Sequence, residues 1–264
     1  MDQVIPSLTI LLEPLAGALR IEAFGMFQLM VGAWIVCLGR RTISRVWETT
    51  GHSLLRNHAA AFRLYSEAAW NWDEVCRIQL LAIVARLVPG MRIWVVVDDT
   101  LCHKRGAKVA FGGIFLDAVL SSKRHKVFRF GNNWVLLGIV VQLPFRKDRY
   151  FCLPGLWRVY QKRGKKAPGQ HRTKSQLAAE MVHQLAGWFG AHKILVVGDC
   201  AYVGQHLLKA REANVEVIGP IRWDASLTTP VDPQASRRRK KGDRLPTPAQ
   251  MLADDRRWPG EDME

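Results

Sequence analysis

The stretch Ile93-Trp94-Val95-Val96-Val97-Asp98-Asp99-Thr100 decides the fold of this chain. Its apolar part is too short and too rich in β-branched residues for a helix, and it follows the helix stop Pro89-Gly90, so it predicts a buried strand. Two carboxylates follow that strand directly. Because ligands of open α/β sheets bind at the carboxyl ends of strands, we expect the functional site there.

Further apolar runs extend this strand into an α/β fold. A helix capped by Thr173 or Ser175 and a helix at Val203–Ala213 separate the later strands. The order β-β-β-α-β-α-β predicts a mixed sheet with helices on its faces. The other expected strands lie at Trp134–Leu143, around Tyr150–Leu153, at Ile194–Val197 and at Val215–Ile218.

Before Pro89 the apolar residues recur at helical spacing and predict an all-α region of three or four helices. The clearest helix begins at Asn71, and its expected buried face is Val75, Ile78, Leu81, Ala82, Ala85 and Val88. The apolar run Leu29–Leu38 is too short to span a membrane and predicts a buried helix.

The chain divides into three expected parts. Residues 1–90 form a helical N-terminal region with a candidate DNA-binding role, and residues 91–222 form the α/β domain. Residues 223–264 are rich in Pro and Arg, include the basic run Arg237–Lys241, and predict a disordered tail or linker.

Composition restricts the function classes. The chain of 264 residues is 48% hydrophobic with a formal net charge of +15, which excludes wholesale disorder and calls for a polyanionic partner. No basic amphipathic helix with an aromatic face points to a membrane. The first residues lack the basic start of a secretory signal, so we expect a cytoplasmic, nucleoid-associated protein. Five cysteines without a C-x-x-C pair argue against a disulfide framework and a zinc ribbon.

A second carboxylate, Asp199, follows the fourth expected strand after one glycine. If the two strands are parallel neighbours, Asp99 and Asp199 come close together, which favours a shared proton or a divalent cation between them. Helix capping is the rival use of Asp199. With a very basic surface, a Mg²⁺ or Mn²⁺ site predicts phosphodiester hydrolysis or transfer.

Basic residues cluster in loops that contain few acids, which favours contact with a phosphate backbone over plain solvation. The segment Arg40–Trp47 is equally consistent with a recognition helix and with ordinary surface. The candidate DNA-binding residues are Lys104, Arg105, Lys123, Arg124, Lys126, Lys162, Arg163, Lys165, Lys166, Arg172 and Lys174.

The combination of motifs between about Asn57 and Pro220 resembles the catalytic domain of DDE-type transposases of bacterial insertion sequences. The matching pieces are Val96–Thr100 with Lys104 and Gly106, Gly131-Asn-Asn-Trp134 leading to Leu143-Pro144-Phe145, Thr173-Lys174, and Val196-Val-Gly-Asp199-Cys-Ala-Tyr202.

The resemblance implies an RNase H-like fold in which Asp99, rather than Asp98, is the first metal ligand and Asp199 the second. It implies Mg²⁺ or Mn²⁺ as cofactor and double-stranded DNA, as transposon ends and target, as substrate. Water would attack at the element ends, and the resulting 3′-hydroxyl would attack target DNA. We also expect self-association, and help from the N-terminal region in recognising the ends.

The family's third acid is a Glu on a helix after the fifth strand, and this element is missing here. After Pro220 the only glutamates are Glu261 and Glu264, and neither is assigned a role. We therefore expect a chain truncated before the third acid, in which catalysis is impaired or lost. Two alternatives stay open: a non-catalytic DNA-binding remnant that inhibits an intact transposase, and another RNase H-like nuclease.

Overall fold

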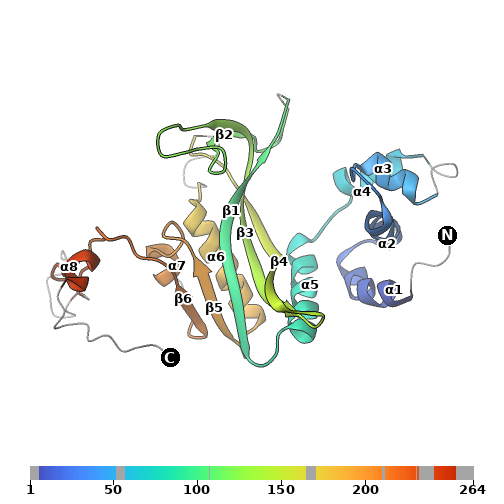
Figure 1. Cartoon of the computed structure of the whole chain (residues 1–264). Coiled ribbons are helices and arrows are strands. Elements are labelled where there is room, and N and C mark those ends of the chain that lie inside the picture. Colours follow the sequence, from blue (N-terminus) through green and yellow to red (C-terminus); the bar gives the residue numbers. More distant parts are fainter. Residues whose placement is uncertain are drawn as a thin grey trace. The chain divides into compact units, whose positions relative to one another are not determined.

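The computed structural model describes residues 6–51, 57–106, 108–164, 171–209, 212–229, 231 and 241–253. The chain forms two compact units, Met1–Leu87 and Val88–Glu264. Their elements are labelled in Figure 1. Within the described residues, no helix has the length and apolar character needed to cross a membrane.

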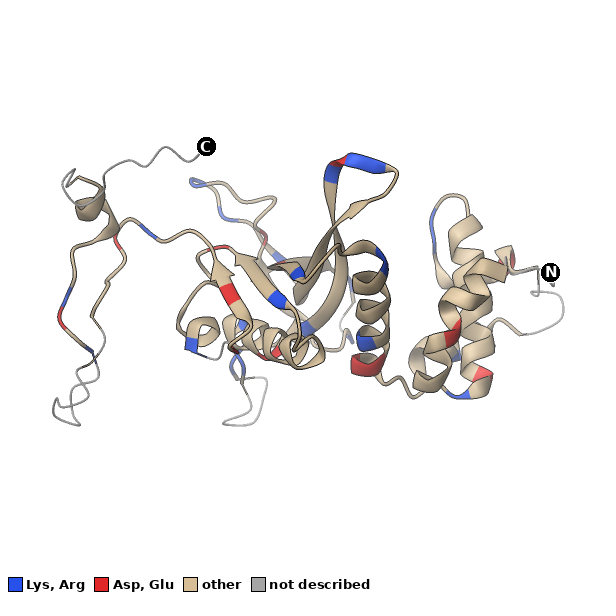
Figure 2. Ribbon diagram, turned by 90° about the horizontal axis from the view of Figure 1, so that it is seen from below, with Lys and Arg blue, Asp and Glu red and all other residues tan. Residues whose placement is uncertain are grey.

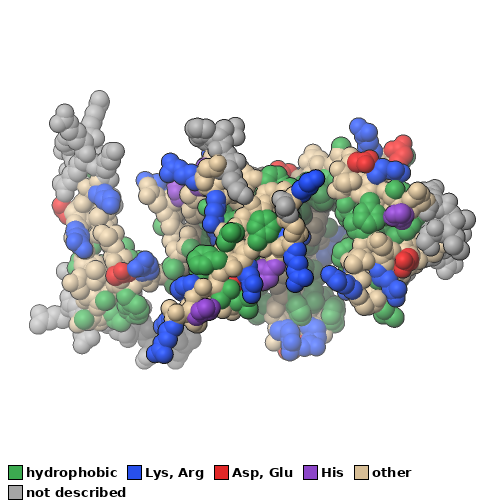
Figure 3. Space-filling view, turned by 90° about the horizontal axis from the view of Figure 1, so that it is seen from above, with side chains coloured by type: hydrophobic (Ala, Val, Ile, Leu, Met, Phe, Trp, Pro, Cys, Tyr) green, Lys and Arg blue, Asp and Glu red, His purple; other side chains and the backbone are tan. Residues whose placement is uncertain are grey.

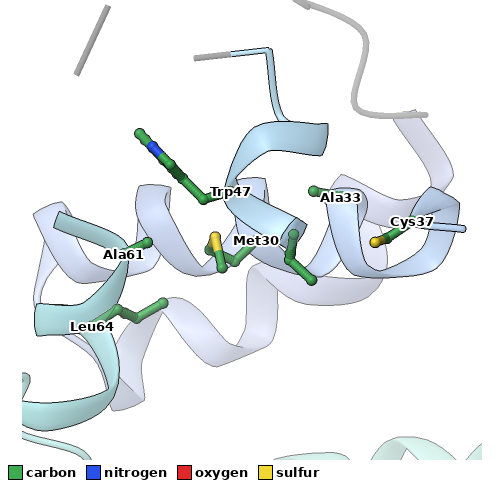
Figure 4. Close-up of a cluster of buried hydrophobic side chains, with 7 residues drawn as sticks. Met30, Ala33, Cys37, Trp47, Ala61 and Leu64 are labelled. Atoms are coloured by element: carbon green, nitrogen blue, oxygen red, sulfur yellow. The ribbon is translucent and has the colours of Figure 1, made fainter. Parts of the chain in front are cut away.

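The first unit is helical, as predicted. Its core lies among three helices: Met30, Ala33 and Cys37 from α2 and its end, Val46 and Trp47 from α3, and Ala61 and Leu64 from α4 (Figure 4). The elements are α1 (Pro6–Leu12), the 3₁₀ helix η1 (Glu13–Ala18), α2 (Ile21–Val36), α3 (Ile43–Thr49), α4 (Ala59–Ser66) and α5 (Trp72–Leu87).

The helix α2 contains most of the apolar run Leu29–Leu38 but is buried on one side only. Met30 and Ala33 are buried, whereas Ile35 is 60% exposed and Leu38, just after the helix, is 86% exposed. The prediction of a helix is confirmed, and the prediction that it is buried is wrong for its last turn, where Trp34, Ile35 and Val36 are exposed. The reason is that only one side of α2 packs against α3 and α4.

The helix α5 begins where the sequence predicts. The Asn71 side chain accepts a hydrogen bond from the Glu74 amide (3.2 Å) and caps the helix. Its buried residues are Val75, Cys76, Leu80 and Val84, so the predicted face is wrong except at Val75. Apolar residues occur around most of this helix, and their spacing therefore does not single out one face.

The second unit is built on one mixed sheet of six strands. The strand β3 pairs antiparallel with β1, and β4 pairs antiparallel with β3; on the other side of β1, β5 and then β6 continue the sheet in parallel. These strands are β1 (Arg92–His103), β2 (Gly113–Leu116), β3 (Phe128–Leu143), β4 (Arg146–Tyr160), β5 (Lys193–Gly198) and β6 (Val215–Ile218).

The fold class is confirmed, with two differences in the strands. The short β2 was not predicted. It pairs with the start of β3, where Gly131 faces His103 on one side and Gly113 on the other. The strand β1 is also longer than predicted, so Asp98 and Asp99 lie within it rather than after it. Both differences arise because β1 and β3 stay paired beyond the apolar runs.

Helices pack on the sheet where the sequence predicts. Thr173 caps α6 (Lys174–Trp188) in a capping box with Gln176, and the buried side of α6 includes Leu177, Met181 and Leu185. The next helix, α7 (Gln205–Lys209), is shorter than predicted.

The described part of the C-terminal tail contains some structure that the sequence does not predict. A short helix, α8, spans Pro248–Leu252, and Thr228 forms an isolated β-bridge with Arg244. Arg237 to Lys240 of the basic run lie outside the described residues.

Gly131 offers a test of the β1–β3–β2 junction. A Cβ atom there would lie 2.2 Å from the backbone oxygen of Cys102, so Gly131→Ala forces the paired strands apart. We expect it to lower the free energy of unfolding by about 1–3 kcal/mol, measured by urea denaturation. The control is Gly187→Ala in α6, which has open space around the new atom and should be neutral or stabilising. Equal effects would contradict this view of the junction.

Candidate functional site

The candidate site lies where the parallel ladder between β1 and β5 ends. The last pair of that ladder is Val97 with Gly198, and Asp199 follows immediately. The antiparallel ladder between β1 and β3 continues as far as His103 and Gly131. The two strands are therefore parallel neighbours, as the metal hypothesis requires, and their aspartates follow the same end of the shared ladder.

Three side chains from three different elements hold the carboxylate of Asp99. Lys174, at the start of α6, donates to Oδ2 from Nζ at 2.5 Å, and the Tyr202 hydroxyl donates to Oδ1 at 2.6 Å. The amide of Asn133, in β3, donates to Oδ2 at 3.3 Å. The ammonium group of Lys174 also lies 5.8 Å from the centre of the Tyr160 ring. Residues from α6, β3 and the turn after β5 thus all bind this one carboxylate.

The electrostatics of the site keep Asp99 ionised. Burial raises the pKa of the Asp99 carboxyl, but the hydrogen bonds from Lys174 and Tyr202, the charge of Lys174 and the Asn133 amide together lower it below its ordinary value. The side chain of Asp99 is 25% exposed and that of Lys174 34% exposed. A negative charge is therefore maintained at the edge of the core and is matched by an internal cation.

Tyr202 supplies a buried hydroxyl group to the site. It is buried, and burial followed by its hydrogen bond to Asp99 raises the pKa of its hydroxyl far above the ordinary value. The charges of Asp98 and Asp199 raise it further. The Tyr202 hydroxyl therefore stays protonated and serves as a hydrogen-bond donor to Asp99.

Asp199 is exposed and holds a turn with one of its carboxylate oxygens. Its Oδ1 accepts a hydrogen bond from the Ala201 amide (2.9 Å) in the turn before α7. This contact belongs to a turn, and the prediction that Asp199 caps the next helix is wrong because α7 begins only at Gln205. Among the described residues no hydrogen bond involves its Oδ2, so the contact leaves a carboxylate oxygen for another ligand.

The chemistry of these residues fits a divalent cation. Carboxylate and carboxamide oxygens are ligands that Mg²⁺ and related ions use in proteins. Asp99, which already attracts a cationic side chain, and Asp199 would supply carboxylates, and the buried Oδ1 of Asn133 has no hydrogen-bond partner among the described residues. Within the same part of the chain, no group of three His, Cys, Asp or Glu side chains is arranged to hold a metal. Glu261 and Glu264 lie outside it.

Two of the candidate DNA-binding residues have charges that bind acidic residues of this chain. Lys174 binds Asp99, and Arg172 donates to Glu180 of α6 at 2.8 Å. The structure therefore places Lys174 in the carboxylate site rather than on a separate surface.

The remaining candidates lie in loops around the sheet, where Lys and Arg positions recur (Figure 2). Lys162 lies 5.3 Å over the Phe115 ring of β2. Lys104 and Arg105 line a cavity that is described further below. Lys123, Arg124, Lys126 and Arg163 are exposed, and Lys165 and Lys166 lie outside the described residues.

Sequence reasoning assigned no role to two of the residues that bind Asp99. Tyr202 lies three positions after Asp199 in the sequence. This spacing was the only signal that could have indicated that Tyr202 belongs to the carboxylate site. Asn133 belongs to a Gly-Asn-Asn-Trp motif, but its proximity to Asp99 depends on the register between β1 and β3, which pairs Leu101 with Asn133.

The bond between Tyr202 and Asp99 predicts a pH-dependent loss of stability. Tyr202→Phe should lower the free energy of unfolding at neutral pH by roughly 1.5–3 kcal/mol, the value of a hydrogen bond to a charged group. Because folding raises the pKa of Tyr202, this stabilisation is complete below pH about 10 and declines as pH rises further. The deficit of the variant should therefore shrink above pH 10 in urea denaturation.

The control for this prediction is Tyr150→Phe, since the Tyr150 side chain is exposed. It should change stability little at any pH. A deficit of Tyr202→Phe that stays constant through pH 10 would contradict the assigned bond.

Comparison with known proteins identifies the family. No curated protein matches the sequence. The family model described as DDE superfamily endonuclease matches residues 18–264, which include both units and the candidate site. Endonucleases of this superfamily are transposase-type nucleases that act on DNA and generally use divalent metal ions. With Asp99 and Asp199 at the end of one parallel ladder and the match spanning nearly the whole chain, this protein belongs to the DDE superfamily endonucleases.

Proposed function

We propose that this chain is a transposase of a bacterial insertion sequence that cleaves DNA and transfers the cut strand with Mg²⁺ or Mn²⁺. The observation that carries the proposal is the half-buried, ionised Asp99, which follows the same end of the parallel ladder as Asp199, with basic loops on the same unit. A buried negative charge that attracts a cation, next to a surface that attracts phosphate, suits phosphodiester chemistry.

Asp99 and Asp199 are the residues that would hold the metal ions. When bound, such ions activate the attacking oxygen and stabilise the leaving oxygen of a phosphodiester. Tyr202 and Asn133 position the Asp99 carboxylate by holding both of its oxygens. The side chains have a binding and positioning role, and no covalent enzyme intermediate is required.

The substrate that we propose is double-stranded DNA, as the ends of the element and as the target. The exposed cations of the loops suit backbone contact, which would make binding strongly dependent on salt. Strand transfer at two ends calls for self-association of the chain. A DNA substrate also places the activity at the nucleoid, in the cytoplasm.

The direct test is metal-dependent nicking of DNA that carries the ends of the element in which this gene lies. Asp99→Asn and Asp199→Asn should each reduce nicking about a hundredfold or more, because several kcal/mol of charge stabilisation are removed. The control is Asp148→Asn, an exposed aspartate near the start of β4 that pairs with Arg146. It should nick normally. Nicking that survives Asp99→Asn would refute the assigned site.

A second candidate function is DNA binding without catalysis, as an inhibitor of an intact transposase. It is favoured by one observation: within the described residues no third carboxylate joins Asp99 and Asp199 to complete a metal cluster. Salt-sensitive DNA binding that is unchanged in Asp99→Asn, together with no nicking by the unaltered chain, would support this function. Preference for branched DNA or an RNA·DNA hybrid would instead support another RNase H-like nuclease.

Lys174 provides a test of metal binding that does not depend on turnover. Its ammonium group occupies Oδ2 of Asp99, so it competes with any cation for that oxygen. Lys174→Met should therefore bind Mn²⁺ more tightly, on the order of tenfold, in calorimetric titration. The matched control is Lys193→Met, which removes an exposed ion pair with Glu216 and should leave Mn²⁺ affinity unchanged. Weaker binding by Lys174→Met would show that Lys174 supports the metal site rather than competing with it.

A further inference from the structure

The segment between β1 and β3, residues 104–127, forms a basic arm on the sheet. It contains six Lys and Arg residues and a single acid, Asp117. At its base the Lys104 amide donates to the Phe130 carbonyl (3.1 Å), so the two ends of the arm are held together. A cavity of about 430 Å³ opens at this base, and we call it the arm pocket. It is lined by His103, Lys104, Arg105, Leu120, Arg129 and Phe130.

The one acidic residue of the arm, Asp117, is buried and hydrogen-bonded within the protein. Asp117 is 3% exposed, and its Oδ2 lies 2.5 Å from Nε2 of His103. Its Oδ1 accepts hydrogen bonds from the amides of Val119 and Leu120. These contacts fix the loop that carries Leu120, and within the described residues Asp117 forms no ion pair with Lys104, Arg105 or Arg129.

Three basic side chains therefore line one cavity. Within the described part of the chain, no ion pair involves Lys104, Arg105 or Arg129. Like charges held together repel, and an anion between them removes that cost. The charge of the pocket thus calls for an anionic ligand, and Arg and Lys are the side chains that bind phosphate.

The other wall of the pocket is apolar. Phe130 is partly buried, and Leu120 is 49% exposed although it lines a cavity. Further apolar side chains lie uncovered on the arm and next to it, including Phe111 at 54% and Phe128 at 60%. Figure 3, seen from the side of β2, shows basic and hydrophobic side chains interleaved on this face. A phosphate group alone would make no favourable contact with this apolar wall of the pocket.

A nucleotide offers both chemistries at a matching size. Its phosphate suits the cations and its base suits an aromatic or aliphatic wall, and the volume lies within the range of small-ligand pockets. Bases of an intact duplex are stacked and paired, so a duplex presents phosphates to a protein loop without a free base face. The combination therefore selects an unpaired nucleotide.

We propose that the arm pocket binds one unpaired nucleotide of the DNA substrate, with its phosphate held by Lys104, Arg105 and Arg129 and its base packed on Phe130 and Leu120. The inference rests on the proposed function in one respect, which is that DNA is the ligand. It adds a recognition element for strand ends or opened base pairs. This element lies beyond Asp99 along β1, because the pocket is built where that strand ends.

The test compares binding of the full chain to fluorescently labelled duplexes by anisotropy, with Ca²⁺ in place of Mg²⁺ to prevent cleavage. A duplex with a short single-stranded overhang should bind about tenfold more tightly than a blunt duplex of the same sequence, the value expected for one stacked base. An overhang in which the bases are replaced by abasic sites should lose that preference. The protein is unchanged in this comparison, so no folding defect can account for the result.

Variants then locate the preference. Leu120→Ala removes a half-exposed side chain and should reduce the preference for the overhang without affecting the blunt duplex. Arg129→Gln should weaken binding of the overhang, whereas the matched control Arg146→Gln, at the first residue of β4, should not. Phe130→Leu should keep the fold and reduce the preference.

The outcomes separate this inference from the proposed function. Equal binding of blunt, overhang and abasic duplexes, with nicking that still depends on Asp99, would overturn the arm pocket alone. A preference for the overhang that is unchanged in Leu120→Ala, Phe130→Leu and Arg129→Gln would also overturn it. Failure to bind any of these DNAs would overturn the proposed function together with the inference.

Discussion

The pairing of β1 with two unlike neighbours is the constraint on which the site depends. Its parallel partner β5 ends at Gly198, while its antiparallel partner β3 continues to the start of the arm. The strand β1 therefore has a paired strand on both sides as far as Val97, and only β3 beside it from there to His103. Asp99 lies at that transition, close enough to the core to be half-buried and close enough to the edge to meet side chains from β3, α6 and the turn after β5.

A carboxylate in that position is stable only if its charge is balanced. Burial favours the neutral acid, and the cation and hydrogen-bond donors around Asp99 reverse that preference. The capping box at Thr173 is part of the same arrangement, because it fixes the first turn of α6 and hence the position of Lys174. The local cap of α6 thus helps to position Lys174 for its long-range ion pair with Oδ2 of Asp99.

The sequence predicts the apolar strands, the cap of α6 and the two aspartates that follow the parallel ladder, because each depends on a short local pattern. It does not predict the buried face of α5, where apolar residues surround the helix. It also misses β2 and the roles of Tyr202 and Asn133, since these depend on strand register and on contacts between residues far apart in the chain. Residue type indicates which side chains could bind a metal ion or a carboxylate. The pairing of β1 with β3 from Asp99 to His103 determines which of them lie close to Asp99.

The positive charge of the chain serves two different purposes. Lys174 and Arg172 bind carboxylates of the protein itself, so their charge is used inside the unit. The cations of the arm have no such partner in the described structure, because its one acid is bound to His103 and to backbone amides. The arm therefore carries positive charge that no ion pair compensates within the described residues, and a bound anion would compensate it. If the arm binds DNA as proposed, this local excess of positive charge, more than the net charge of the whole chain, is what directs DNA there.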